Sequence, residues 1–272
     1  MTQTIPPRPE ATIPPVAWGA LTHPGQVRSV NEDGVFSAPD KGLWAVADGM
    51  GGHVGGAEAA ALIVRALAGV PHLRALDAAL DGVDRAVTGA GRDIAALAAR
   101  SPGAVIGATM VALVIRGRDW GCLWAGDSRA YRLRGGRLEQ LTRDHSEVND
   151  LLAAGVITPA EAKTWPRRNV ISRAVGVSDP LVLDRVGGVL EPGDVFVLCS
   201  DGLMKHVTDA EIATLLAAHP QAGAAAGALI DLTLERGAQD NVTVVVVAAP
   251  GIGTGTGPGT GPGNAPAGEA RA

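Results

Sequence analysis

Residues 43–53 read LWAVADGMGGH. An apolar run of strand length ends here in a single carboxylate, Asp48, and the glycines that follow allow the backbone to turn sharply and to approach another group closely. His53 comes next, and a helix rich in small residues begins after it. The stretch therefore predicts that Asp48 and His53 lie at the mouth of a buried sheet, with little side-chain bulk between them.

The same arrangement recurs at three further apolar runs. Asp127 and Asp201 each come at the end of such a run, and Asp240 lies two residues before another. A carboxylate at the end of a buried strand is costly unless it is paired or bound to a cation. One such aspartate is usually a turn residue, but four of them at strand ends indicate a shared site for a hard cation.

Composition limits the classes of protein that fit this chain. With 272 residues, of which 46% are hydrophobic, the chain is long enough for one large domain with a substantial core. A net charge of -5 gives neither a basic surface for nucleic acid nor a polybasic patch for a membrane. No signal peptide or transmembrane helix is expected. Cys122 and Cys199 lie inside apolar runs, as reduced core cysteines do, and the prediction is a soluble, cytoplasmic protein.

The order of the predicted elements favours an α+β fold. Two long helices are expected at 55–69 and 71–100, the second of them kinked or broken near Gly89 to Gly91. Two shorter helices are expected near the end of the chain, at 208–218 and 220–236. Apolar runs and turn signals predict strands at 16–22, 34–36, 43–47, 107–115, 119–126, 130–134, 137–141, 181–189, 194–200 and 242–248.

These elements predict a four-layer α/β/β/α sandwich, in which a central antiparallel β-sandwich is flanked by helix pairs. The folded domain is expected to span residues 16–249, with a mobile flap over the sheet edge at about 145–175. Pro-rich residues 1–15 and the Gly, Pro and Thr-rich residues 250–272 are expected to be disordered.

Arg28 begins a polar cluster that lies between two predicted strands and ends at Asp33. A charged loop of this kind is usually only a solvated turn. The planar guanidinium of an arginine also suits a phosphate or carboxylate group, so Arg28 is a candidate for anion binding.

Six short motifs, taken in order, resemble those of the metal-dependent Ser/Thr protein phosphatases of type 2C, in the compact bacterial branch of that family. The similarity covers the chain from about Trp18 to Ala249. Each motif is weak alone, but six in the family's order and approximate spacing are specific. They are RxxNED at 28–33, ADGMGGH at 47–53, GDSR at 126–129, DHS at 144–146, SDGL at 200–203 and DNVT at 240–243.

The resemblance implies two Mn²⁺ or Mg²⁺ ions in a cleft at one end of the sandwich. Asp48 then bridges both ions, and the Gly49 carbonyl binds one of them. Asp201 and Asp240 hold the other ion. Asp33, with Glu32 beside it, lies on the Gly49 side, and Asp127 matches a position that helps to hold a third, weaker ion. An all-oxygen shell of this kind suits Mg²⁺ or Mn²⁺ better than zinc.

The implied activity is hydrolysis of phosphoserine and phosphothreonine on proteins by direct attack of a metal-activated water. Arg28 matches the arginine that grips the substrate phosphate. His53 matches the family's candidate general acid, although a metal-bound water is an alternative proton donor. Two departures from the usual motifs, Ala57 and Ala108, remove no expected ligand.

The expected partners are phosphorylated proteins, among them a bacterial Ser/Thr kinase and its substrates, and the family precedent is a monomer. One alternative within the enzyme class is a partner-switching phosphatase that acts on one dedicated phosphorylated regulator. The alternative from another class is a catalytically silent module that binds phosphoproteins. Loss of Asp48, Asp201 or Asp240 would indicate such a module, and all three are present.

Overall fold

The central strands carry apolar side chains on both faces because both faces are covered by other elements. In β3 (Leu43–Met50), Trp44 and Val46 are buried in a cluster on one face, and Ala45 and Ala47 are buried in a cluster on the other. A strand buried on both sides shows no alternation of apolar and polar residues. This burial accounts for the continuous apolar runs from which the strands were predicted.

A computed structural model describes residues 13–100, 103–167 and 170–250, and its strands form two antiparallel sheets. The 5-stranded sheet has the order β1 (Ala17–His23), β11 (Val242–Ala248), β10 (Val195–Cys199), β7 (Arg129–Arg134) and β8 (Arg137–Gln140). The 6-stranded sheet has the order β2 (Asp33–Ala38), β3, β5 (Met110–Arg116), β6 (Asp119–Ala125) and β9 (Asp184–Val189), with β4 (Gly107–Ala108) paired to the end of β3.

The first and last of the described strands are neighbours in the 5-stranded sheet. Ala17 of β1 lies opposite Ala248 of β11, and His23 lies opposite Val242. The two strands therefore run side by side over their whole length. Their His23 and Val242 end leads into the loops that carry Arg28 and Asp240.

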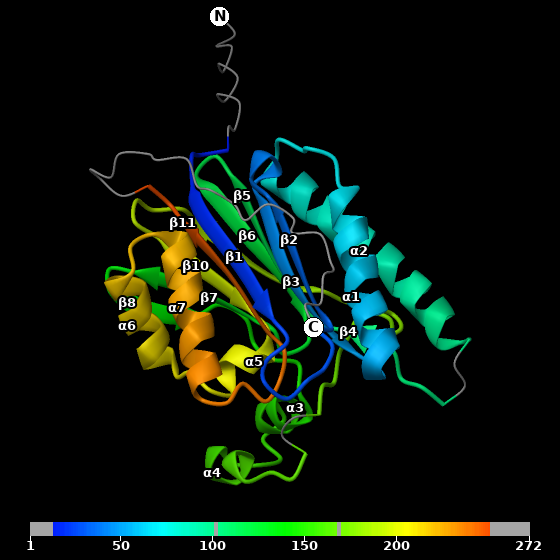
Figure 1. Ribbon diagram of the computed structural model, residues 1–272. Coiled ribbons are helices and arrows are strands. Elements are labelled where there is room, and N and C mark those ends of the chain that lie inside the picture. Colours follow the sequence, from blue (N-terminus) through cyan, green and yellow to red (C-terminus); the bar gives the residue numbers. More distant parts are fainter. Residues whose placement is uncertain (1–12, 101–102, 168–169, 251–272) are drawn as a thin grey trace, which may run out of the picture.

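Helices cover the outer faces of the two sheets (Figure 1). The pair α1 (Gly52–Ala68) and α2 (Leu76–Ala98) packs on the 6-stranded sheet, and α6 (Asp209–Ala218) and α7 (Ala222–Glu235) cover the other sheet. The short helices α5 (Asp201–Met204), α3 (Glu147–Ala153) and α4 (Pro159–Lys163) lie at one end of the sandwich. A single 3-10 turn, η1 (Pro39–Lys41), joins β2 to β3. The fold-class prediction is confirmed.

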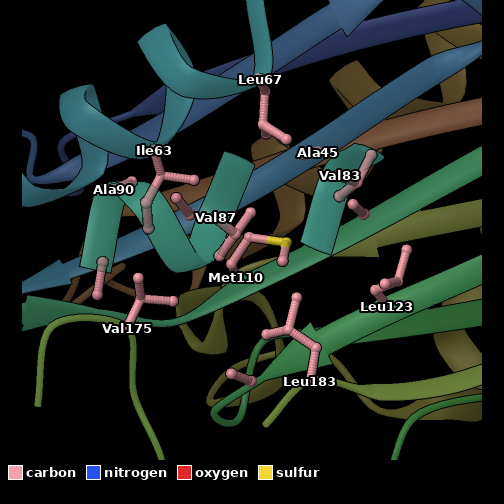
Figure 2. Close-up of a cluster of buried hydrophobic side chains, with 14 of the residues drawn as sticks. Ala45, Ile63, Leu67, Val83, Val87, Ala90, Met110, Leu123, Val175 and Leu183 are labelled. Atoms are coloured by element: carbon pink, nitrogen blue, oxygen red, sulfur yellow. The ribbon is translucent and has the colours of Figure 1, made fainter. Parts of the chain in front are cut away.

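Three clusters of buried side chains lie between the two helix layers and the two sheets and hold them together. The layer between α1, α2 and the 6-stranded sheet contains Ile63, Leu67, Val83, Val87 and Met110, and Figure 2 shows how they interdigitate. The layer between the sheets is built on large side chains, including Trp44, Trp120 and Phe196. The third layer lies between the 5-stranded sheet and α6 and α7. Apolar burial on this scale is the main stabilising contribution to the fold.

The predicted break at Gly89 to Gly91 is wrong, because α2 runs through both glycines as one helix of 23 residues. The physical reason is burial: Val87, Ala90 and Ile94 all face the core on either side of the glycines. Glycine in a helix costs about 1 kcal/mol relative to alanine, and this tertiary packing outweighs that cost.

The predicted flap region lies between β8 and β9 and contains α3 and α4. Thr158 caps α4 through a capping box with Glu161.

The predicted disordered ends, 1–15 and 250–272, fall almost entirely outside the described residues. Among the described helices, none combines the length and apolar character that a membrane crossing needs. Cys122 and Cys199 are buried free thiols, as expected.

Candidate metal centre

Five aspartates gather at one end of the sandwich, the end that carries α5 and α3 in Figure 1. Electrostatics shows that they act on one another, because the charges of the other four all raise the pKa of Asp48. They are Asp33 at the start of β2, Asp48 near the end of β3, Asp127 after β6, Asp201 at the start of α5 and Asp240 before β11.

Asp33 and Asp48 lie directly opposite each other in the β2–β3 pair. Like charges in that position destabilise an antiparallel sheet. Burial, and then the charge of Asp33, hold the pKa of Asp48 well above its usual range. Burial raises the pKa of Asp33 to about 6, despite hydrogen bonds that work in the opposite direction. The pair therefore resists full ionisation unless a cation balances it.

Asp33 also connects the two sheets. Its Oδ2 accepts hydrogen bonds from Ser200 Oγ at 2.8 Å and from Thr243 Oγ1 at 2.7 Å. Ser200 follows β10, Thr243 lies on β11, and the Thr243 amide donates to Ser200 Oγ at 3.0 Å. Oδ1 of Asp33 is buried and has no hydrogen-bond partner in the described part of the chain. One oxygen is thus held in place while the other is available to a cation.

A second set of hydroxyl contacts ties Asp127 to the end of β3. Ser128 Oγ lies 2.6 Å from Thr109 Oγ1, and the Thr109 amide donates to the Asp48 carbonyl at 2.8 Å. Burial, with the charge of Asp201, raises the pKa of Asp127 to about 7. Asp127 Oδ1 is buried, and the described residues offer it no hydrogen-bond partner.

Gly49 lies where two other backbone segments meet. A Cβ at this position would stand 2.1 Å from the Gly56 carbonyl oxygen and 2.6 Å from the Glu32 carbonyl oxygen, so no larger residue fits. Glu32 Oε1 is buried near Gly56 without a hydrogen-bond partner among the described residues. Glu32 is therefore on the Gly49 side of the site.

Asn241 positions the loop that carries Arg28 and Glu32. Its Oδ1 accepts from the Glu32 amide at 2.8 Å, and its Nδ2 donates to the carbonyl oxygens of Pro24 and Val30, both at 2.9 Å. Asn241 stands in the DNVT motif, but nothing in the motif indicates this role. The partners come from a loop more than two hundred residues away in the chain.

Lys205 lies between Asp201 and Asp240. Its Nζ is 2.6 Å from Asp201 Oδ2 and 2.9 Å from Asp240 Oδ2. Burial would lower the pKa of Lys205, but the two carboxylates outweigh it and raise the pKa above its ordinary value. Burial also raises the pKa of Asp201, and Lys205 only partly offsets that effect. Lys205 is a residue of the site that the sequence analysis missed.

Arg28 makes an ion pair with Asp240. Its Nε lies 3.0 Å from Asp240 Oδ1, and Nη2 donates to Oδ2 at 3.2 Å, while 53% of the arginine side chain stays exposed. Burial would raise the pKa of Asp240, but Lys205 and then Arg28 outweigh burial and lower it. The arginine predicted to bind phosphate is thus at the site, with its guanidinium held at the solvent edge.

The donor set fits hard divalent cations. The buried free oxygens of Asp33 and Asp127, and the raised pKa values of Asp33, Asp48 and Asp127, are what a missing positive charge would produce. Within the residues described, however, no three His, Cys, Asp or Glu side chains form a compact metal-binding group. Lys205 and Arg28 engage oxygens of Asp201 and Asp240. Ion binding would require these cations to move.

His53 lies in the first turn of α1, after Gly51 and Gly52 with φ of 137° and 71°. Its side chain is outside the described part of the structure. The backbone therefore follows the glycine turn predicted from residues 43–53, and the proposed proton-donor role of His53 stays a prediction.

The DHS motif at 144–146 has structural roles. Asp144 accepts from Arg129 Nε at 2.8 Å and Nη2 at 2.7 Å. His145 Nδ1 accepts from the Gly126 amide at 3.0 Å, and burial lowers the pKa of His145. Ser146 caps α3. The motif thus fixes the turn that precedes Asp127 and anchors the flap.

A groove of about 710 Å³ leads from the aspartates toward the flap. Asp127, Asp201 and Lys205 line its end at the metal centre, and Lys163 of α4 lines its flap side. An extended peptide whose side chain reached the aspartates would pass close to this groove.

A model of the family described as Protein phosphatase 2C matches residues 26–226. The solved structure of PppA, a key regulatory component of T6SS in Pseudomonas aeruginosa, is similar with a TM-score of 0.80 and 42% identity. That similarity covers 87% of this chain and 99% of the PppA chain.

Serine/threonine protein phosphatase PstP of Mycobacterium tuberculosis (strain ATCC 25618 / H37Rv) is 38% identical over 239 residues, which is 84% of this chain. The chain spans only 44% of the length of that relative. The PstP catalytic domain solved in complex with 2 manganese ions has a TM-score of 0.74 and 37% identity, over 86% of this chain and 97% of that one.

Proposed function

The chain belongs to the protein phosphatase 2C family, and from that premise we propose that it is a metal-dependent serine/threonine protein phosphatase. The observation that carries the proposal is the cluster of five aspartates, with raised pKa values and free buried oxygens, at one end of the sandwich. The reaction is hydrolysis of phosphoserine and phosphothreonine on proteins, without a covalent intermediate. The two cysteines are buried, and burial raises the pKa of both thiols, so neither serves as a nucleophile.

Each ligand has a proposed place around two Mn²⁺ or Mg²⁺ ions. Asp48 would serve as a ligand for both ions, and the Gly49 carbonyl and Asp33 would hold one of them. Asp201 and Asp240 would hold the other ion, and Asp127 would help to hold a third, weaker one. When bound, such an ion pair supplies a water that is nucleophilic near neutral pH and neutralises the phosphoryl oxygens.

Arg28 is the proposed phosphate-binding residue. Its guanidinium is already at the solvent edge of the site and already in contact with a carboxylate, so a phosphate can replace Asp240 as its partner. A bidentate contact would orient the phosphoryl group for in-line attack. His53 is the proposed donor of a proton to the departing serine or threonine oxygen.

The proposed partners are phosphorylated proteins, and the proposed role is to oppose a bacterial Ser/Thr kinase. The similarity to PstP and PppA supports this role. We also propose that the protein acts as a monomer in the cytoplasm, which agrees with its net charge of -5 and its two free, buried cysteines.

Activity of the purified protein tests the proposal. Hydrolysis of p-nitrophenyl phosphate and of a phosphothreonine peptide is measured after metal removal, and again with Mn²⁺ or Mg²⁺. The expected result is turnover that requires the metal and that Asp48→Asn and Asp201→Asn each reduce by at least about a hundredfold, because each removes a proposed ligand.

Asp231→Asn is the matched control, because Asp231 is an exposed aspartate on α7 that is not among the five aspartates of the site. It should retain the parent activity. Absence of turnover with either ion, from protein whose circular dichroism is that of a folded chain, would overturn the phosphatase proposal in favour of a phosphoprotein-binding module.

A further inference from the structure

The groove between the acidic end and the flap has an apolar side. Val148 and Leu152 lie four residues apart on α3, so they share one face of the helix, and both line the groove. Asp150, between them on α3, is exposed and does not line it. Ala162 of α4 and Met204 of α5 add to the apolar lining. The volume of about 710 Å³ falls within the range of about 300 to 1,000 Å³ that is usual for ligand sites, so a short stretch of polypeptide has room there.

Two positive side chains line the same groove. Lys163 is the last residue of α4 and is exposed, and no carboxylate within the described residues pairs with it. Arg143 is also exposed. Its Nη2 donates to the Asn149 carbonyl, and its own carbonyl accepts from Trp124 Nε1 at 2.9 Å, so the residue is held in place without a described ion-pair partner. Both cations are available to an anionic group on a bound peptide.

The carboxylates near these two cations are engaged elsewhere. Asp144, which also lines the groove, accepts two hydrogen bonds from Arg129, at 2.8 and 2.7 Å. Glu161 is engaged in the capping box of α4. Glu147 pairs with Arg167 at 2.9 Å. Apart from the proposed metal ligands, the described lining of the groove therefore carries positive charge, in a chain whose net charge is -5.

The groove connects these cations to the proposed catalytic centre. Asp127 and Asp201 line one end of it, and Lys163 lines its flap side. When a phosphorylated side chain reaches the aspartates, the neighbouring residues of its chain lie beside the groove. A carboxylate on one of those residues would meet a positive charge, and a lysine or arginine there would be repelled. A contact of this kind, away from the reacting phosphoryl group, stabilises the bound substrate and the transition state equally, so it changes KM and leaves kcat unchanged.

We propose that this groove binds the substrate chain next to its phosphorylated residue and, through Lys163 and Arg143, selects phosphoproteins that carry an acidic side chain there. The inference rests on the proposed phosphatase function. It makes Lys163 and Arg143 specificity-determining residues and gives neither a part in the chemical step. Hydrolysis of p-nitrophenyl phosphate, which has no peptide chain, is then independent of both.

Steady-state kinetics of the full chain with Mn²⁺ test this. The substrates are phosphothreonine peptides of one length in an uncharged host sequence, with glutamate, alanine or lysine placed at each position in turn on either side of the phosphothreonine. In at least one position, glutamate is expected to lower KM about two- to fivefold relative to alanine, as an exposed ion pair does. Lysine in that position should raise KM, kcat should stay unchanged, and the preference should weaken as the salt concentration rises.

Variants of the two cations make the result specific. In Lys163→Glu, the preference at the position that Lys163 contacts should invert, with lysine now lowering KM, while p-nitrophenyl phosphate is hydrolysed as by the parent protein. Lys163→Met should remove that preference without inverting it. Arg143→Gln keeps a donor for the Asn149 carbonyl and should weaken the preference for glutamate. Arg137→Glu is the matched control, because Arg137 is an exposed arginine on β8 that does not line the groove, and it should leave every preference unchanged.

The outcomes separate the inference from the function on which it rests. No turnover of p-nitrophenyl phosphate or of any peptide would overturn the phosphatase function itself. Turnover of the peptides with equal KM for glutamate, alanine and lysine at every position would overturn the inference alone. So would a preference for glutamate that Lys163→Glu leaves unchanged, because the acidic side chain would then bind elsewhere.

Discussion

Asp33 has the most demanding position among the residues of the site, because three requirements meet in one carboxyl group. It faces a second aspartate across the β2–β3 pair, it is buried, and it accepts two hydroxyl hydrogen bonds from the opposite sheet. The two hydroxyls satisfy only Oδ2 of Asp33, and Oδ1 has no hydrogen-bond partner among the described residues. The side chain is thereby oriented before any cation arrives, which lowers the cost of ordering it on binding.

Thr243→Val should separate this orientation from general stability. The substitution removes the 2.7 Å hydrogen bond to Asp33 and the 2.7 Å hydrogen bond with Thr22 Oγ1, while keeping the β-branched shape. We expect the free energy of unfolding of the metal-free protein to fall by about 1 to 2 kcal/mol, and Mn²⁺ affinity, measured by calorimetric titration, to fall by about tenfold or more.

Thr233→Val is the matched control for that variant. Thr233 is also fully buried, but its hydroxyl donates to the Leu229 carbonyl inside α7 and contacts none of the five aspartates. It should cost less than about 1 kcal/mol and leave Mn²⁺ affinity unchanged. Equal Mn²⁺ affinities in the two valine variants would show that the Asp33 contact does not position a ligand.

For individual residues of the site, the sequence predicts the positions of the carboxylates better than it predicts which side chains pair with them. The strand-end position of Asp48, Asp127, Asp201 and Asp240 is visible in the sequence because burial of a lone carboxylate needs an explanation. The bridging position of Lys205 is not visible, since it depends on α5 meeting the loop before β11. That meeting is a property of how the two sheets pack, and no local pattern encodes it.

In helix α2, tertiary packing outweighs the local tendency of two glycines to end a helix. Gly89 and Gly91 predict a break, but the helix runs unbroken from Leu76 to Ala98 because its inner face is held by the core. In contrast, the strands were predicted well. Continuous apolar runs such as β5 and β11 carry a strong signal that tertiary packing reinforces.

Gly89→Ala should therefore stabilise the protein. A Cβ at Gly89 would meet nothing closer than Arg92 Nη2 at 4.0 Å, and the backbone is already helical. We expect the free energy of unfolding in urea to rise by about 0.5 to 1 kcal/mol, because alanine loses less conformational entropy than glycine in a helix.

Gly176→Ala is the contrasting change beneath the same helix. Gly176 has a φ of 87°, and its Cβ would stand 2.2 Å from Ile94 Cγ2 of α2. We expect a loss of about 2 to 4 kcal/mol from backbone strain and overpacking. A loss of stability on Gly89→Ala would instead mean that a kink at this glycine matters to the fold.

For the whole molecule, the acidic cluster makes stability depend on pH and on metal together. The pKa of Asp127 is raised from 3.8 to about 7, and that of Asp48 is raised well above its usual range. The native state therefore takes up protons before the unfolded chain does, so its stability in a chelator increases as the pH falls through this range.

We expect the melting temperature in EDTA to rise between about pH 8 and about pH 6.5, by roughly 2 to 4 °C from Asp127 alone, which corresponds to about 1 kcal/mol. The range stops at the ordinary histidine pKa of 6.5, because His145, whose pKa is lowered by burial, opposes the trend below it. In saturating Mn²⁺ the trend should reverse, since protons then compete with the ions for the same carboxylates. Scanning calorimetry measures both curves.

Asp127→Asn should remove part of the rise seen in EDTA, and Asp231→Asn should leave it intact, because Asp231 is exposed on α7. A melting temperature in EDTA that stays level or drops over the same pH range would mean that the aspartates ionise freely without a cation.

The pairing of β1 with β11 places the two ends of the described sheet next to each other. Ala17 lies opposite Ala248, and each lies at the far end of a seven-residue strand from the acidic end, a distance of about 20 Å at the usual rise of a strand. A short peptide can therefore join the chain into a ring without crossing the mouth of the site. New termini can then be opened at an exposed loop such as Gly135–Gly136, between β7 and β8. The fold is in this sense suited to circular permutation, with the acidic end of the sandwich left open.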